Sequence, residues 1–542
     1  MGIMARFRET PLVKEMTGPL LLVSIFSSLG GMSFGIDNAY WGGLLGMTKF
    51  REDFGRIDPL TDAWNIPTTW QSIGSGTPTA GVAIGCLLAA PLSSRLGRKR
   101  SFIILSIVGI VGILIQATAQ SSYWQILVGR IINSLSMGII CNVVPLYQTE
   151  CAPPAIRGAA INFYQFWQLF GALLSTIINY ACQHRTDQWA YRTIIIIQFA
   201  IPAILFVGAF YLPDSPRWLL SKGRRDEATE VMIWLRKKTP KDLVIEEMRL
   251  IEVSIEEQKQ EHFAATYIDC FRGTNRRRTL IAIGVQSFQQ LQGASFILNY
   301  IYVFLESIGV SNTYAIGMYL YLVNLASAGA AFYIADKFGR RNLMGLGALV
   351  QTAMMLTVGG LAGVDGAKTS AQQNGALAAL FIWLAIQAFA WGSCVWITTA
   401  EVGTLQLREK TITLATFFGF AFALAVTYVN PYMQNAGYGN LQGKVGFVYG
   451  GFSFVSLLFV IFYLPELKGR SLEELDELFQ KRISVWSFGK AVTEGVGAEI
   501  RAIDDQIGEG LERKVIEGVK VEGDHELKNS VDVGVKEKAE RV

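Results

Sequence analysis

The chain has 542 residues, of which 51% are hydrophobic and only 17% are charged, and it carries 54 glycines. A mean hydropathy of +0.33 and repeated apolar runs of about twenty residues, the length that crosses a hydrocarbon core as a helix, predict a protein that crosses a membrane many times. The net charge of +4 does not indicate nucleic-acid binding, and three histidines with six scattered cysteines predict neither a metal site nor a disulfide framework.

Twelve apolar runs follow a polar stretch at 1–17 and predict an all-α membrane protein with two sets of six transmembrane helices. We expect the first six-helix bundle within 18–212, with spans at about 18–45, 70–93, 101–119, 124–146, 158–180 and 193–212. We expect the second bundle within 279–464, with spans at about 279–305, 313–335, 342–362, 375–400, 411–433 and 446–464.

The segments outside the bundles are charged. Lysine and arginine concentrate in the loops on one side, so the positive-inside rule places both termini in the cytoplasm. The segment 213–278 predicts a cytoplasmic linker, because its part at 241–262 has apolar residues at helical spacing among many carboxylates. The tail at 465–542 is also expected in the cytoplasm and largely disordered after about 480, where periodicity is weak.

Paired motifs indicate that the two sets are parallel repeats. The turn Gly97-Arg98-Lys99 returns as Gly339-Arg340-Arg341, each time between two apolar runs. Two further pairs recur in the same order, at offsets of 251 and 252 residues, close to the 242 of the turns. These are Glu150 seven residues before Arg157 with Glu401 seven before Arg408, and Pro213-Asp214 with Pro465-Glu466.

The repeated charges predict a gate on the cytoplasmic side. Acidic and basic groups at the ends of spans can bridge the two halves when that side is closed and part when it opens. Exposed pairs contribute at most about 1 kcal/mol each, so such a gate biases the two states without locking one. The alternative is that each charge satisfies a helix end within its own half. The gate residues are Arg98, Glu150, Arg157, Asp214, Arg340, Glu401, Arg408 and Glu466.

Two charges lie inside predicted spans. Asp37 in the first span and Arg130 in the fourth both lie roughly 10 Å below the outer surface, at 1.5 Å per residue. An ionised group at mid-helix costs about 2.5–3.5 kcal/mol on insertion scales, so we expect the two to pair. The pair is either structural or a titrating site, at which Asp37 takes up a proton when its contact with Arg130 lengthens.

Neutral polar side chains inside the spans predict a site for a hydroxyl-rich ligand. Amides both donate to and accept from hydroxyls, and an indole offers a flat apolar face for a sugar ring. The amides could instead only join neighbouring helices, but no charged cluster accompanies them, which disfavours a charged substrate. The side chains are Gln165, Gln289, Gln290, Gln292, Ser295, Asn324, Trp391 and Trp396. The spacing of 289, 292 and 296 puts these three positions on one helix face, with 290 turned away.

Over about 20–480 the chain resembles the sugar porter family of the major facilitator superfamily, in particular its fungal hexose and oligosaccharide porters. The resemblance rests on the two basic turns, on Gly129-Arg130, on 145–150 with Arg157-Gly158, and on 270–275. Its most specific motifs are Pro213-Asp214-Ser215-Pro216-Arg217-Trp218-Leu219, Gln289-Gln290-Leu291-Gln292-Gly293 and Pro465-Glu466-Leu467-Lys468-Gly469-Arg470-Ser471-Leu472-Glu473-Glu474.

The resemblance implies a sugar site and a proton site. The sugar site would involve Gln165, Gln289, Gln290, Asn324 and Trp396, with Tyr300 near an outer gate. The pair of Asp37 and Arg130 would drive proton symport, as in some members, although facilitative members also carry the Asp. The pocket departs from the family pattern, because Ser295 replaces an Asn and Gly419-Phe420 replaces Asn-Trp, so a preference for glucose is left open.

These observations predict a monomeric transporter that moves a sugar, a hexose in the first place, with a proton across a fungal-type plasma membrane. We expect no cofactor, no metal, no nucleic-acid partner and no enzymatic activity; the partners are the sugar, H+ and the lipid bilayer. The alternatives are a facilitative uniporter and a carrier of a polyol, a disaccharide, a quinate-like acid or a secondary metabolite. A non-transporting sugar sensor is an alternative of another class.

Overall fold

The structure, a computed structural model, describes most of the chain between residues 17 and 493. The described residues are 17–57, 62–152, 157–237, 240–252 apart from 243, 246, 247 and 250, and 266–493 apart from 311, 365, 367, 405, 406, 436, 469, 471 and 492. They fall into two compact units, the first ending at Glu466 and the second beginning at Leu467.

The first unit begins with a helical bundle in which each long helix follows an apolar run. Its long helices are α3 (Gly18–Gly46), α5 (Thr68–Leu96), α6 (Arg98–Ala117), α7 (Tyr123–Cys151), α8 (Arg157–Cys182) and the consecutive pair α9 (Trp189–Ile197) and α10 (Ala200–Ala209). The Thr17 side chain caps α3 by accepting from the Leu20 N–H. A short helix α4 (Thr48–Phe54) and the antiparallel strands β1 (Arg56–Ile57) and β2 (Trp64–Asn65) join α3 to α5.

The second bundle of this unit contains two helices that are interrupted in the middle. Its elements are α14 (Gly273–Gln289), η3 (Gln290–Ala294), α15 (Ser295–Ser307), α16 (Thr313–Phe338), α17 (Arg340–Ala362), α18 (Ser370–Ile386), η4 (Gln387–Gly392), α19 (Ser393–Val402), α20 (Arg408–Gln434), η5 (Gln442–Lys444) and α21 (Val445–Tyr463). The segments η3 and η4 are π-helical, and Gly293 inside η3 has a positive φ of 107°. Such π segments occur frequently at functional sites.

The helices confirm the predicted architecture of two six-helix sets. Within the described residues, nine stretches are long and apolar enough to cross a membrane. The three remaining predicted spans lie in α8, in α14 with η3 and α15, and in α16. Several helices extend beyond the predicted ends: α7 continues to Cys151, about one turn past 146, and thereby carries Glu150.

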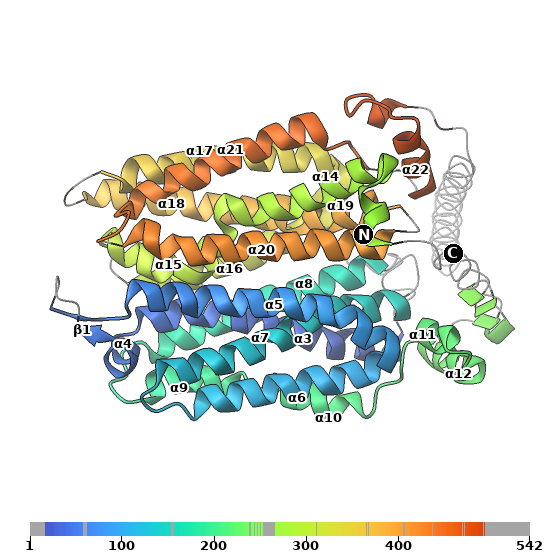
Figure 1. Cartoon of the computed structure of the whole chain (residues 1–542), viewed down its shortest axis with the longest axis horizontal. Coiled ribbons are helices and arrows are strands. Elements are labelled where there is room, and N and C mark those ends of the chain that lie inside the picture. The colour runs from blue at the N-terminus through green and yellow to red at the C-terminus, as the bar shows by residue number, and fades with distance from the viewer. Residues whose placement is uncertain are drawn as a thin grey trace, which may run out of the picture. The chain divides into compact units, whose positions relative to one another are not determined.

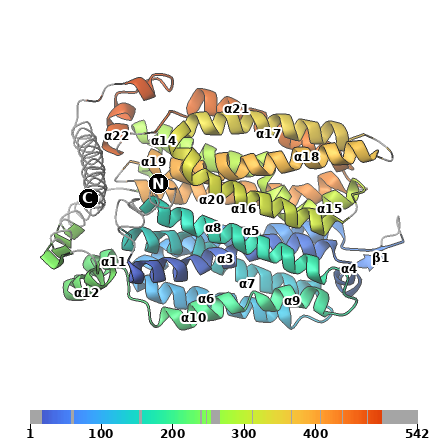
Figure 2. The ribbon, with the colours of Figure 1, turned by 180° about the vertical axis from the view of Figure 1, so that it is seen from behind.

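The helices run side by side (Figures 1 and 2), and the contacts between the two bundles include α3 with α15. Within the first bundle α3 packs on α8 and α7 packs on α5 and α6, while α17 packs on α18 and α21 in the second. Between the bundles α5 lies against α20, and α8 lies against α16. Small residues permit the closest approach: a Cβ on Gly35 would lie 1.8 Å from the Gln168 carbonyl oxygen of α8.

The bundle unit has two distinct ends. One end, here called the basic end, carries the turns at 97–100 and 339–341 together with the linker helices α11 (Pro216–Ser221) and α12 (Arg225–Leu235). The other, here called the distal end, carries α4 and β1 (Figure 1). The linker continues to η2 (Tyr267–Phe271). The helix expected at 241–262 is helical in its described part, up to 252, and the rest lies outside the described residues.

The second unit is small. It contains α22 (Leu472–Gln480) and η6 (Phe488–Lys490), held by a buried pair in which Arg470 lies 3.0 Å from Glu474 Oε1. The Thr493 hydroxyl donates to the same oxygen at 2.7 Å. The described chain is therefore folded somewhat past 480, and the remaining residues of the tail that we expected to be disordered lie outside the described residues.

Candidate functional site

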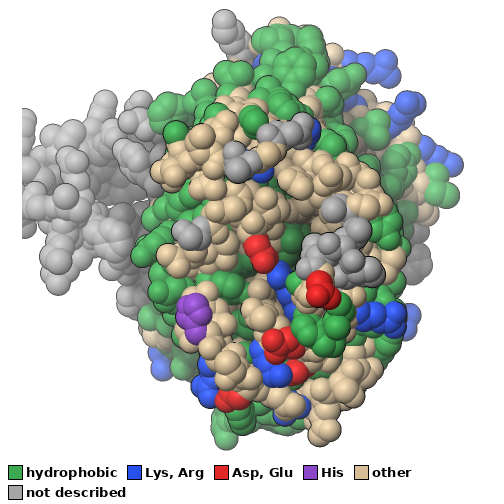
Figure 3. All heavy atoms as spheres, turned by 90° about the vertical axis from the view of Figure 1, so that its left-hand side faces the viewer, with side chains coloured by type: hydrophobic (Ala, Val, Ile, Leu, Met, Phe, Trp, Pro, Cys, Tyr) green, Lys and Arg blue, Asp and Glu red, His purple; other side chains and the backbone are tan. Residues whose placement is uncertain are grey.

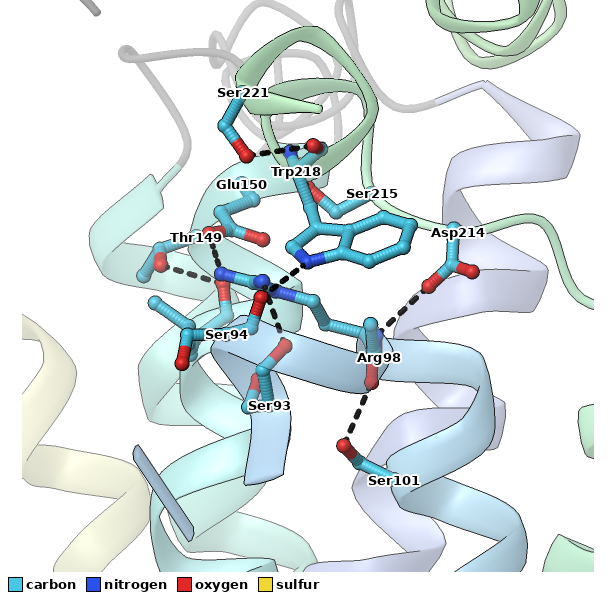
Figure 4. A network of polar contacts seen from close by, with 12 residues as sticks. Ser93, Ser94, Arg98, Ser101, Thr149, Glu150, Asp214, Ser215, Trp218 and Ser221 are labelled. Carbon is cyan, nitrogen blue, oxygen red and sulfur yellow. Dashed lines mark hydrogen bonds and ion pairs between the residues drawn. The ribbon is translucent and has the colours of Figure 1, made fainter. Parts of the chain in front are cut away.

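The basic turn at 97–99 is held by a network within the first bundle (Figure 4). Gly97 adopts a φ of 89°, and a Cβ there would lie 2.8 Å from Asp214 Oδ1. That oxygen accepts hydrogen bonds from the backbone N–H groups of Arg98 and Lys99, at 2.7 and 2.9 Å, at the N-terminus of α6, where a carboxylate is favoured. The Arg98 guanidinium lies 2.5 Å from Glu150 Oε1 of α7, and both side chains are largely buried.

The second bundle repeats this arrangement residue for residue. Gly339 adopts a φ of 85°, and Glu466 accepts from the backbone N–H groups of Arg340 and Arg341 at 3.0 and 3.2 Å. The Arg340 guanidinium lies 3.4 Å from Glu401 Oε1. Both turns thus join a capping carboxylate, an arginine and a second glutamate, as expected of parallel repeats.

In both networks the described ion pairs join residues of the same bundle. This arrangement corresponds to the alternative in which each charge satisfies a helix end of its own half. The gate that bridges the halves therefore stays a prediction for the state in which the basic end is closed. The Arg157 side chain lies outside the described residues, and Arg408 begins α20.

At the distal end, by contrast, the two bundles are joined directly. Arg51 of α4 makes a two-pronged contact with Glu306 of α15, with nitrogen–oxygen distances of 2.6 and 3.2 Å. The Tyr314 hydroxyl of α16 donates to the Gly43 carbonyl of α3 at 2.7 Å. Acidic and basic side chains lie intermixed on this face (Figure 3). The bundles are closed on each other here.

Tyr300, expected near an outer gate, lies at a junction of the two bundles. Its hydroxyl donates to the Thr427 carbonyl of α20 at 2.8 Å and lies 3.4 Å from the Gln71 carbonyl of α5. The side chain is 1% exposed. A tyrosine held in this way between helices of different bundles can block passage while the contact lasts.

Asp37 and Arg130 are not directly paired, which corrects the expected contact. Asp37 Oδ1 accepts from Asn133 Nδ2 at 2.8 Å, and no ion pair within 4.0 Å joins it to Arg130 in the described chain. Arg130 instead donates to the Gly74 carbonyl at 2.5 Å and lies 3.9 Å from the centre of the Trp41 ring. A carbonyl and an aromatic face replace the carboxylate as the direct partners of the cation.

Three of the predicted sugar contacts have unused hydrogen-bonding groups. Gln165 of α8, Asn324 of α16 and Trp396 of α19 form no hydrogen bond with any described residue through their side chains, although none of the three is fully exposed. The helices α8 and α16 pack together, and α16 also packs against η4. Amide and indole groups held inside a bundle without protein partners are available to a polar ligand.

The polar side chains around η3 differ in their burial and in their hydrogen-bond partners. Gln290 accepts from the Ser295 hydroxyl at 2.6 Å, and Gln289 donates to the Trp391 carbonyl in η4 at 3.4 Å. Gln292 is fully buried and donates to Ser456 of α21 at 2.5 Å. Gln289 and Gln292, which the spacing predicts on one helix face, thus contact different neighbours, η4 and α21.

Trp391 is part of the core and not of an open site. It is fully buried, and its indole N–H donates to the Met344 carbonyl of α17 at 3.1 Å.

Two buried polar contacts were not predicted from the sequence. Asn133 lies one turn after Arg130 on the same helix face, a spacing that could have revealed it. The contact of Gln351 with Gln387 joins α17 to η4 and left no sequence signal beyond an amide inside an apolar run.

Comparisons with known proteins give a consistent result. A family model described as sugar (and other) transporter matches residues 23–479. The chain is 32% identical to the major facilitator-type transporter ecdD of Aspergillus rugulosus, over 85% of this chain and 88% of the relative. It is 30% identical to the high-affinity glucose transporter ght2 of Schizosaccharomyces pombe, over 86% and 89%. The solved proton:xylose symporter XylE bound to 6-bromo-6-deoxy-D-glucose superposes with a TM-score of 0.68 at 23% identity, over 85% and 99%.

Proposed function

We propose a function from one premise: the chain belongs to the sugar transporter family of the major facilitator superfamily. It carries a sugar, a hexose in the first place, across a membrane by alternating access, and it performs no covalent chemistry. The observation that carries this proposal is the set of open polar groups on Gln165, Asn324 and Trp396, which lie on the bundle helices α8, α16 and α19.

The proposed sugar site combines neutral hydrogen-bonding groups with an aromatic face. The amides of Gln165 and Asn324 donate to and accept from ring hydroxyls, and Gln290 with its Ser295 partner offers a further amide. The Trp396 indole provides a flat face for the sugar ring. A site without lysine, arginine or carboxylate selects neutral, hydroxyl-rich compounds over charged ones.

Transport follows from two closures that alternate. The contacts of Arg51, Tyr300 and Tyr314 hold the bundles together at the distal end, which we assign to the outer surface. The charged networks of the basic end, which we assign to the cytoplasm, would bridge the halves when that end closes in turn. Bound sugar shifts the population between the two states only as far as it binds one of them more tightly.

We further propose that transport of the sugar is coupled to the uptake of a proton by Asp37. Asp37 is 7% exposed in an apolar bundle, so the ionised form depends on the nearby Arg130 and on Asn133. Uptake of one proton by Asp37 neutralises it and weakens its attraction to α7. In this way the charge state of the first span influences the packing of its bundle, and hence the two-state equilibrium.

We place the protein as a monomer in the plasma membrane, with both termini in the cytoplasm. The support for this orientation is the concentration of lysine and arginine at the basic end. Accessibility of tags at the two termini in intact and permeabilised cells tests it. Labelling of either tag in intact cells would contradict the assignment.

The decisive experiment is a radiolabelled uptake panel in cells that lack hexose transport. D-glucose, D-fructose, D-xylose, a polyol, a disaccharide and quinate are compared at two pH values, with and without a protonophore. We expect hexose uptake that falls at the higher pH and on addition of the protonophore. Uptake insensitive to both favours a uniporter, and retained hexose binding without any flux favours a sugar sensor.

A further inference from the structure

A buried amide faces the acid of the proposed proton site. Asn133 of α7 donates to Asp37 Oδ1 at 2.8 Å, and the two side chains are 0% and 7% exposed. Arg130, one turn earlier on α7, is directed at the Gly74 carbonyl and the Trp41 ring. Asn133 is therefore the direct polar partner of the acid in this conformation.

The oxygen end of the same amide can exchange positions with the NH2 end. Asn133 Oδ1 is buried and accepts no hydrogen bond within the described chain. It points at α6, where a Cβ on Gly109 would lie 3.5 Å from it. Because Gly109 has no side chain and the two ends of an amide have nearly the same shape, either the oxygen or the NH2 group fits this place.

We propose that Asn133 is a positioning residue that serves Asp37 in both of its protonation states. When Asp37 is ionised, the amide N–H donates to the carboxylate, as observed. When Asp37 takes up a proton, the amide turns over, its oxygen accepts the acid O–H, and its NH2 group takes the place beside Gly109. The proton stays on Asp37 throughout, and Asn133 itself neither gains nor loses one. The inference rests on the proposed proton coupling and deepens it.

Few charged groups compete with this amide. Arg130 is the charged residue one turn from Asn133 on α7, and its guanidinium is directed at the Gly74 carbonyl and the Trp41 ring. On α3 itself the Tyr40 hydroxyl is occupied by Gln116 of α6 at 2.8 Å, and on α15 the Tyr300 hydroxyl is occupied by Thr427. The stretches 68–94, 101–117, 158–182 and 200–209 of the surrounding helices contain no Asp, Glu, Lys, Arg or His.

The substitution Asn133→Leu tests the proposal, because it keeps the branched shape of the side chain and removes both polar ends of the amide. The full-length protein is reconstituted in proteoliposomes, and uptake of D-glucose is followed against pH. Hydrogen bonds to charged groups are stronger than those to neutral ones, so Leu destabilises ionised Asp37 more than the acid. We expect the pH at which uptake falls to half to rise by about one unit.

Two further variants guard against a trivial loss of folding. Asn133→Asp keeps the shape and puts two carboxylates in contact, which hold one proton between them, so the half-uptake pH rises further. Ser134→Ala is the matched control: it is buried at the next position of α7 but packs against Gly81, 3.1 Å from where a Cβ there would lie. We expect its pH profile to coincide with that of the wild type.

The double exchange Asp37→Asn with Asn133→Asp separates a paired role from a structural one. It restores the contact of acid and amide in reverse order, and we expect several-fold more D-glucose accumulation than with Asp37→Asn alone. A wild-type pH profile in Asn133→Leu, or a double exchange no better than Asp37→Asn, overturns the inference. Wild-type uptake that is independent of pH, with no proton uptake on addition of D-glucose, overturns the proton coupling itself.

Discussion

At the residue scale, the open amides of Gln165 and Asn324 are the groups whose removal bears most directly on sugar binding. We expect Gln165→Ala and Asn324→Ala each to raise the KM for hexose uptake about 3- to 10-fold, since each loses one hydrogen bond worth about 0.5–1.5 kcal/mol. Surface expression should stay normal, because neither amide bonds to another described residue. Uptake kinetics at matched expression measure the effect.

Gln292→Met provides the control for these two variants. Gln292 lies in the same polar region of the sequence but bonds to Ser456 of α21 and is fully buried. Its replacement should lower the melting temperature of the purified protein and leave the KM unchanged. If Gln292→Met raises the KM and the other two do not, the assignment of ligand-facing and structural amides is reversed.

Asp37 carries the second residue-scale prediction. The Asp37→Asn variant cannot take up a proton, so we expect it to lose uphill accumulation. Exchange of labelled for unlabelled sugar across the membrane should stay measurable, because it needs only the sugar site and the rocking of the bundles. Accumulation at the wild-type level in a pH gradient would exclude Asp37 as the coupling site.

The sequence predicted which residues are polar inside the bundles, but not which way each one points. Spacing along a helix predicts the depth of a residue such as Asp37 or Arg130 in its span. It does not give the direction of a long side chain, and Arg130 turns to the Gly74 carbonyl and Trp41. Gln292 lies in the π segment η3, where the number of residues per turn differs and the 100° rule of the α-helix does not apply.

At the scale of elements, the length and apolarity of the runs were sufficient to predict the helices. A run of about twenty apolar residues has few alternatives to a spanning helix, because its backbone groups must be satisfied internally. The interruptions η3 and η4 were not predictable in the same way. They lie inside continuous apolar runs, and their deviation depends on packing against neighbours such as α16 and α21.

The two glycine turns at the basic end allow an element-scale prediction. Gly97→Ala should destabilise the protein by about 1–2 kcal/mol through its positive φ, and further through the approach of a Cβ to Asp214. Gly223→Ala is a matched control, because Gly223 has a φ of 76° with nothing within 4 Å of a Cβ. The difference in melting temperature between the two variants reports the contacts of the added Cβ, which would lie 2.8 Å from Asp214 Oδ1 and 3.0 Å from the Trp218 ring. Equal melting temperatures would show that the carboxylate yields without cost.

At the scale of the whole bundle unit, the two halves share one continuous hydrophobic core and are also joined by polar contacts at the distal end. The halves contact each other through α5 with α20, α8 with α16 and α3 with α15, and polar contacts between them involve Arg51, Tyr300 and Tyr314. At the basic end the described ion pairs remain within each half. The contacts between the halves at the distal end correspond to one of the two states that alternating access requires, the state in which the distal end is closed.

We therefore expect the pair of Arg51 and Glu306 to stabilise the state that is closed at the distal end, and to contribute little to the stability of the fold. Its side chains are 16% and 55% exposed, so the pair contributes at most about 1 kcal/mol, a factor of about five in the ratio of the two states. We expect Glu306→Gln to shift the population toward the state that is open at the distal end by up to this factor. The rate at which a single cysteine near Tyr300 reacts with an impermeant thiol reagent measures the shift.

A charge exchange and a distant ion pair complete this test. Arg51→Glu combined with Glu306→Arg should return the labelling rate toward that of the parent, because the attraction is restored in reverse. Asp187→Asn is the control: it breaks the exposed pair with Arg185, at 2.9 Å, which lies within one loop of the first bundle and joins no halves. The same increase in labelling for Asp187→Asn and Glu306→Gln would attribute the effect to surface charge. It would contradict a role of the Arg51–Glu306 pair in holding the bundles together.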